Sequence, residues 1–152
     1  MRRPLDALIA EFNRIYNWDI MPDTSRDLCD FAPFDAYTKH NVSGFVLSNI
    51  ETWTRLHAEI VEKCSKFKCH VVFYEDLQKN MIDEMTIILN YIGFDMNAAI
   101  EKCLTSCGTG KFKRKTKPKK LLDKIYSLFT KQQLEYFDTL YTNYRNKLIE
   151  IN

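Results

Sequence analysis

Apolar residues recur at helical spacing along most of the chain. In residues 4–16 an apolar side chain follows every three or four positions, and Pro4 suits the first turn of a helix, where its missing N–H costs nothing. Similar spacing predicts further helices over residues 44–66, 81–91, 96–107 and 129–150. The pattern therefore predicts a mostly helical chain.

Two of these helices also carry end signals. Gly93 follows residues 81–91 and is expected to adopt the left-handed conformation that ends many helices. Thr130 and Gln133 have the spacing of a capping box at the start of the last helix. Residues 17–43 show no clean period and contain prolines at 22 and 33, so we expect a long loop there.

Residues 71–74 interrupt the helical pattern. They are Val, Val, Phe and Tyr, a continuous apolar run that is typical of a buried parallel strand, and we expect it to pack between the helices that contain Leu56 and Ile88. A lone parallel strand cannot satisfy its own backbone groups. A second strand either lies hidden in the loop 17–43 or is missing from this chain. We favour the second, and expect a mostly helical part of a larger α/β domain.

Composition fits one folded domain with an unusual charge distribution. The chain has 152 residues, of which 45% are hydrophobic and 13% aromatic, enough apolar mass for a core. Residues 111–120 carry seven of the 22 basic residues and none of the 20 acidic ones. A protein that coats nucleic acid spreads its positive charge over a face. This local concentration instead indicates an anion site or a tail, and no specific nucleic-acid partner is expected.

The chain shows no targeting or membrane-spanning segment and no metal motif. Its N-terminal stretch is amphipathic, and no run approaches the ~18 apolar residues that span a bilayer. The five cysteines lack the pair spacing of zinc ligands, so no metal is expected. The triplet 41–43 is a glycosylation sequon, a pattern that is also common by chance, so the secretory interpretation stays open.

Six motifs then point to a family. RRPLDALIAEFNR, WTRLH, VVFYEDLQKN, ILNYIGF, EKCLTSCGTGKFKRK and LFTKQQLEYFD occur in the order and with roughly the spacing seen in sulfotransferases. Over Arg2 to about Tyr144 the chain resembles this family, most closely the WSC-domain-containing sialate O-sulfotransferases of the Golgi. The resemblance implies a P-loop-like α/β fold and the transfer of a sulfuryl group from 3′-phosphoadenylyl sulfate (PAPS) to a hydroxyl, here of a glycan in the Golgi.

The resemblance also implies which residues bind the nucleotide. Arg2 matches the arginine that holds the 3′-phosphate, and an arginine just before a helix N-terminus is also a ready anion site on physical grounds. Tyr74 matches a position whose ring lies near the adenine. Gly110, Lys113 and Arg114 match a late glycine-and-basic loop over the same 3′-phosphate. At Ala10 the chain departs from the family, because many members have a serine there that also contacts this phosphate.

The family's loop for the 5′-phosphosulfate precedes the arginine turn at which this chain starts. Residues 1–152 are therefore expected to form a partial sulfotransferase domain, as a fragment, a short isoform or a degenerate member, whose catalytic residues are unknown and which alone does not transfer sulfate. The alternative is a noncatalytic basic module that binds polyanions, such as nucleic acid or heparin-like glycans, through residues 111–120. Within that run, residues 115–120 are expected to be solvated.

Three titratable residues to which the resemblance assigns no role allow two interpretations each. His57 lies on the apolar face of its helix, where a core histidine with a backbone partner is expected and a role as general base is the alternative. Glu75 and Asp76 follow the predicted strand directly. Carboxylates at that point can be catalytic, but we expect them to cap the next helix or to pair with Lys79.

Overall fold

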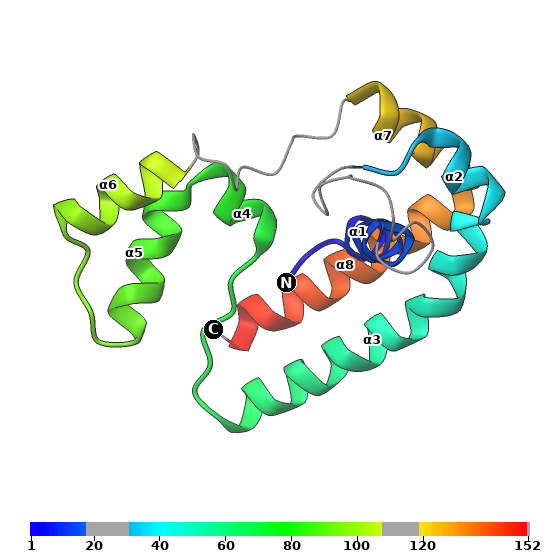
Figure 1. Ribbon diagram of the computed structural model, residues 1–152. Helices are drawn as coiled ribbons and strands as arrows, with labels where there is room; N and C mark the ends of the chain where they lie inside the picture. Colours follow the sequence, from blue (N-terminus) through cyan, green and yellow to red (C-terminus); the bar gives the residue numbers. More distant parts are fainter. Residues whose placement is uncertain (18–30, 108–118, 152) are drawn as a thin grey trace.

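The computed structural model describes residues 1–17, 31–107 and 119–151, and these residues are almost all helical (Figure 1). In chain order the helices are α1 (Pro4–Ile15), α2 (Phe34–Lys39), α3 (Val42–Lys66), α4 (Tyr74–Lys79), α5 (Met81–Tyr91), α6 (Ala98–Cys107), α7 (Lys119–Tyr126) and α8 (Lys131–Ile151). No strand occurs in the described part of the chain. None of its helices combines the length and apolarity needed to cross a bilayer.

The core forms where α1, α3 and α8 pack on one another (Figure 1). Each helix buries one apolar stripe, as the spacing predicts. Fully or almost fully buried members of this core are Leu8, Ile9, Phe12, Tyr37, Val46, Trp53 and Phe137. Helices α2 and α7 pack on each other at one end of the core, whereas α4, α5 and α6 form an arm that extends to the other side (Figure 1).

The helices predicted over residues 4–16, 44–66, 81–91, 96–107 and 129–150 are confirmed by α1, α3, α5, α6 and α8. Both end signals are confirmed as well. Gly93 has a φ of +83°, in the left-handed region. Thr130 and Gln133 exchange hydrogen bonds of 2.8 Å and 3.2 Å between side chain and backbone, which satisfies two N–H groups at the start of α8.

The long loop predicted over residues 17–43 is wrong in its second half. Residues 34–39 form α2, which is too short to show a helical period, and α3 begins at Val42. Asn41 joins the two helices in a left-handed conformation, with its Oδ1 accepting a 3.1 Å hydrogen bond from the backbone N–H of Gly44. This side chain lies so close to Gly44 that a Cβ there would be 2.4 Å from its Nδ2. Residues 18–30 lie outside the described part.

Helix α7 was also not predicted from the sequence. It begins with Lys119 and Lys120, two of the basic residues that we expected to be solvated, and Lys120 is indeed exposed. The helix is anchored one turn later by Ile125, which is fully buried. The basic run therefore ends in a helix that belongs to the core, while residues 108–118 lie outside the described part.

The prediction of a strand over residues 71–74 is wrong, because none of these residues is in a strand. Tyr74 is the first residue of α4, and residues 68–73 belong to no helix or strand. Phe73 has an extended backbone, with φ −92° and ψ 127°. The N-terminal amine of Met1 donates to the carbonyl of Val72, and the backbone N–H of Tyr74 donates to the carbonyl of Met1 at 2.7 Å. This is the hydrogen-bond pattern of one step of a parallel ladder.

The burial predicted for this run is right only at Phe73. Its side chain is 6% exposed, whereas Val71 and Val72 are half-buried. The packing of this run between the helices that contain Leu56 and Ile88 stays a prediction, although Leu56 itself is 53% exposed. Phe73 has the guanidinium of Arg145, from α8, over its ring at 4.1 Å. The α/β class of a complete domain stays a prediction.

His57 is a core histidine, as expected. It is buried, its ring stacks on Trp53 with centroids 3.7 Å apart, and its Nδ1 lies 2.7 Å from the carbonyl of Trp53. In the neutral imidazole this nitrogen is the donor of that bond. Burial lowers the pKa of His57, because the charged form loses its hydration.

We predict that replacing Phe73 by Ala destabilises the protein by about 3–5 kcal/mol, as is typical when a buried phenylalanine is truncated. The measurement is the free energy of unfolding from urea titration. Phe94→Ala is the matched control, since that side chain is 63% exposed and its loss should change stability by less than about 0.5 kcal/mol. Equal effects of the two substitutions would contradict the packing of Phe73.

The lowered pKa of His57 predicts how the free energy of unfolding changes with pH. Because its pKa in the folded state lies below the unfolded value of about 6.5, the unfolded state binds more protons between the two values. Its contribution is therefore complete above pH ~6.5 and is lost as the pH falls toward the folded pKa, by up to about 1.4 kcal/mol per pH unit. His57→Gln should flatten the curve of unfolding free energy between pH 7 and pH 5. A curve that keeps its slope in His57→Gln would rule out this assignment.

Candidate anion-binding site

Two residues 72 positions apart in the sequence, Arg2 and Tyr74, are in contact. The guanidinium carbon of Arg2 lies 4.8 Å from the centroid of the Tyr74 ring. Arg2 immediately precedes the turn into α1, and Tyr74 opens α4. The two backbone bonds of Met1 with Val72 and Tyr74 hold these chain segments side by side. The contact is therefore fixed by the backbone as well as by the cation–π attraction.

The Arg2 guanidinium has unused hydrogen-bonding capacity. Its Nε is buried and has no hydrogen-bond partner within the described residues. Buried donors of this kind are nearly always paired in folded proteins. Arg2 lies beside the N-terminus of α1, a 12-residue helix with no side-chain cap, where free N–H groups favour negative charge. An unpaired guanidinium donor next to such an end is suited to an anion.

Two carboxylates directly follow Tyr74, and both are occupied. Glu75 accepts a 2.9 Å hydrogen bond from the backbone N–H of Arg3 and a 2.8 Å bond from the hydroxyl of Tyr141. Burial, and then the hydrogen bond to Glu75, raises the pKa of Tyr141, so this hydroxyl stays protonated and can donate. Glu75 thus ties the N-terminal turn to α8.

Asp76 forms an ion pair with Arg145. The Nη2 of Arg145 lies 2.5 Å from Oδ2 of Asp76, and its Nη1 donates to the Tyr141 hydroxyl at 3.1 Å. The two charged side chains are 27% and 29% exposed. Burial opposes the charge of Arg145, but its hydrogen bonds to Asp76 and Tyr141 outweigh this and raise its pKa. The expectation that these carboxylates pair with Lys79 is wrong.

The structure thus brings together two of the five residues expected to bind the nucleotide, Arg2 and Tyr74. The other three, Gly110, Lys113 and Arg114, lie outside the described residues. Ala10 is in α1, two turns from Arg2 along the helix, and contributes no donor. His57 is engaged with the α3 backbone and Trp53, which leaves the alternative of a general base without support.

Sequence reasoning missed Tyr141 and Arg145. Tyr141 falls on the apolar stripe of α8, where its ring is buried, and the pattern gives Arg145 no role. A signal was available, because residues four apart share one face of a helix and an arginine next to an apolar stripe needs a partner. The pattern did not indicate which carboxylate would be that partner.

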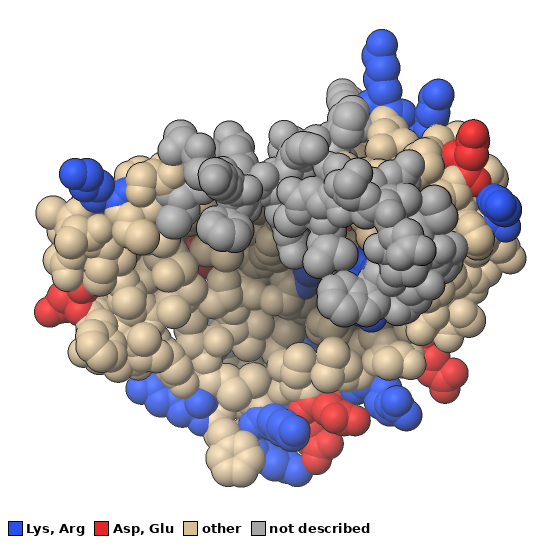
Figure 2. All heavy atoms as spheres, in the orientation of Figure 1, with Lys and Arg blue, Asp and Glu red and all other residues tan. Residues whose placement is uncertain are grey.

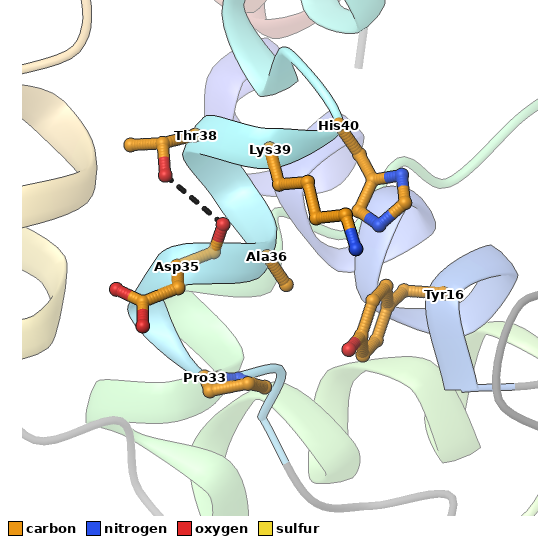
Figure 3. A pocket seen from close by; sticks show the side chains of 7 residues that line it. All are labelled: Tyr16, Pro33, Asp35, Ala36, Thr38, Lys39 and His40. Carbon is orange, nitrogen blue, oxygen red and sulfur yellow. Dashed lines mark hydrogen bonds between the residues drawn. The ribbon is translucent and has the colours of Figure 1, made fainter.

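A hollow lies between α2 and the end of α1, away from Arg2 and Tyr74 (Figure 3). Its volume is about 780 Å³, and its lining includes Tyr16, Lys39 and His40. The Lys39 amine and the Tyr16 hydroxyl face this space, whereas Asp35 points away from it (Figure 3). Lys39 is exposed, and no described atom of the lining is a buried donor or acceptor without a partner. Its chemistry is therefore less specific than that around Arg2.

Among the described residues, charge is not concentrated on the face shown in Figure 2. Basic and acidic side chains are spread along its edges, with uncharged atoms between them. Among the residues described, no group of three or more His, Cys, Asp or Glu side chains could hold a metal ion. Comparisons with models of protein families, with curated proteins and with solved structures find no match to this chain.

Proposed function

We propose that this chain forms part of a sulfotransferase domain and binds the nucleotide portion of PAPS, the donor of a sulfuryl group for a hydroxyl on a glycan. The observation that carries the proposal is the contact between Arg2 and Tyr74. Both positions were assigned to one nucleotide from separate motifs, and chain segments 72 residues apart had to meet for that assignment to be possible.

The geometry suits an adenine nucleotide with a 3′-phosphate. The buried Nε of Arg2 is a charge-assisted donor for the phosphate, and the N-terminus of α1 adds a favourable dipole. Arg2 covers the Tyr74 ring, which is half-buried, so the accessible part of the ring can contact the base. The Tyr74 hydroxyl accepts a 3.0 Å bond from Gln78, one turn further along α4, which limits rotation of the ring.

The basic run would complete the phosphate site. In this proposal Lys113 and Arg114 approach the same phosphate as Arg2, and Phe112 anchors the loop. Glycines 108 and 110 allow the backbone N–H groups to approach an anion closely. PAPS supplies an activated sulfuryl group, and the residues of this chain bind and orient its nucleotide, so that their part in the reaction is positioning and charge neutralisation.

The test is the affinity for adenosine 3′,5′-bisphosphate, measured by calorimetry. A hydrogen bond to a charged group contributes ~1.5–3 kcal/mol, so Arg2→Ala and Arg114→Ala should each weaken binding by roughly 10- to 100-fold. Arg55→Ala is the matched control, because Arg55 is exposed on α3. Simultaneous neutralisation of Lys117, Lys119 and Lys120 should do much less. A wild-type chain that does not bind this nucleotide would refute the proposal.

The same titration tests the alternative of a polyanion-binding module. If residues 111–120 act as diffuse charge, the triple lysine variant loses as much affinity as Arg114→Ala. A module that neutralises ~6 phosphates should also lose affinity for DNA or a heparin-like glycan with a log–log salt slope of about −5. Nucleotide binding at the Arg2 site should be far less sensitive to salt. A steep slope for the nucleotide itself would favour the alternative.

A further inference from the structure

The carboxylates of Glu75 and Asp76 create a problem for an anion site at Arg2. They follow Tyr74 directly in the chain, and Tyr74 is the residue on which Arg2 rests. A carboxylate that reached Arg2 would occupy its guanidinium in the bidentate geometry that arginine favours. The same two charges would also repel any phosphate placed there.

Helix α8 removes both carboxylates from competition. Tyr141 and Arg145 are four residues apart and therefore lie on one face of α8. Tyr141 donates to Glu75 at 2.8 Å, and Arg145 donates to Asp76 at 2.5 Å. Arg145 also donates to the Tyr141 hydroxyl at 3.1 Å, so the two side chains act as one unit.

Arg2 stays available as a result. Within residues 1–17, 31–107 and 119–151, no carboxylate pairs with Arg2, although Glu75 contacts the backbone of the next residue, Arg3, at 2.9 Å. Arg145 also lies 4.1 Å over the ring of Phe73, which precedes Tyr74. The α8 pair therefore contacts Phe73, Glu75 and Asp76, the residues on both sides of Tyr74.

We propose that Tyr141 and Arg145 are positioning residues, which hold Glu75 and Asp76 away from Arg2 and so keep its guanidinium available for the phosphate of a nucleotide. This inference rests on the proposed function and deepens it, since it explains how Arg2 can select an anion although two carboxylates directly follow Tyr74 in the chain. It goes beyond a contribution to stability, because it predicts an effect that depends on the 3′-phosphate of the ligand.

The experiment compares two ligands on the full chain, adenosine 3′,5′-bisphosphate and adenosine 5′-monophosphate, which lacks the 3′-phosphate. In Arg145→Gln the released Asp76 pairs with Arg2. Affinity for the bisphosphate should fall by roughly 5- to 50-fold, and affinity for the monophosphate should change by less than about twofold. Lys147→Gln is the matched control, since it removes one exposed positive charge from the same helix.

A second substitution separates release of the carboxylate from loss of structure. In the double variant Asp76→Asn, Arg145→Gln the side chain freed from α8 is neutral, so bisphosphate affinity should return to within about threefold of the wild type. A variant damaged by misfolding would bind both ligands poorly and would not be rescued. Tyr141→Phe should show the same selective loss, while Tyr136→Phe, which alters an exposed tyrosine of α8, should not.

The outcomes distinguish the two proposals. If the wild type binds the bisphosphate and Arg2→Ala abolishes this, but Arg145→Gln binds like the wild type, the positioning role is refuted and the proposed function stands. An equal loss of affinity for both ligands, or a loss that Asp76→Asn does not rescue, would show that Arg145 contributes to stability alone. Either result would also refute the positioning role. If neither ligand binds the wild type, the proposed function fails, and the positioning role fails with it.

Discussion

The pairing of Met1 with Val72 and Tyr74 is the constraint on which the rest of the candidate site depends. Two backbone hydrogen bonds set the residues around Arg2 beside those around Tyr74, in the manner of adjacent parallel strands. Arg2 then meets the Tyr74 ring, and the N–H of Arg3 meets Glu75. This alignment matters because each of these contacts joins residues that lie 72 positions apart in the chain.

Charged groups accumulate at this junction, and their arrangement decides its chemistry. Arg2, Arg3, Arg145 and the N-terminal amine of Met1 lie near Glu75 and Asp76 at this junction. Arg145 forms an ion pair with Asp76. The guanidinium carbon of Arg3 lies over the ring of Tyr141, 5.5 Å from its centroid. Arg2 lies over the Tyr74 ring, and its Nε is a buried donor with no hydrogen-bond partner among the described residues. Removing one member of such a network leaves an uncompensated charge, which costs more than the pair itself contributes.

The sequence predicted the helices well because their signals are local. The apolar stripes of α1, α3 and α8 repeat over three or more turns, and the capping box of α8 needs only Thr130 and Gln133. Helix α2 was not predicted because six residues are too few to show a period. Helix α7 was not predicted because its first turn is charged, although Ile125 in the same helix is buried. The run at residues 71–74 misled for a different reason. A continuous apolar run is typical of a strand that is buried on both faces, but within residues 71–74 only the side chain of Phe73 is buried.

The site was only half predictable, and the missing half depends on tertiary structure. Arg2 and Tyr74 were identified because each lies in a motif that can be read alone. Tyr141 and Arg145 matter only through Glu75 and Asp76, which lie 66 and 69 residues earlier in the chain. Their pairing follows from the packing of α8 against α1, and that packing depends on Phe137 and its apolar neighbours. The apolar stripe that stabilises α8 in the core thus also sets the register at which its polar edge reaches the carboxylates. A shift of α8 by one residue would turn Arg145 by about 100° and break its ion pair with Asp76.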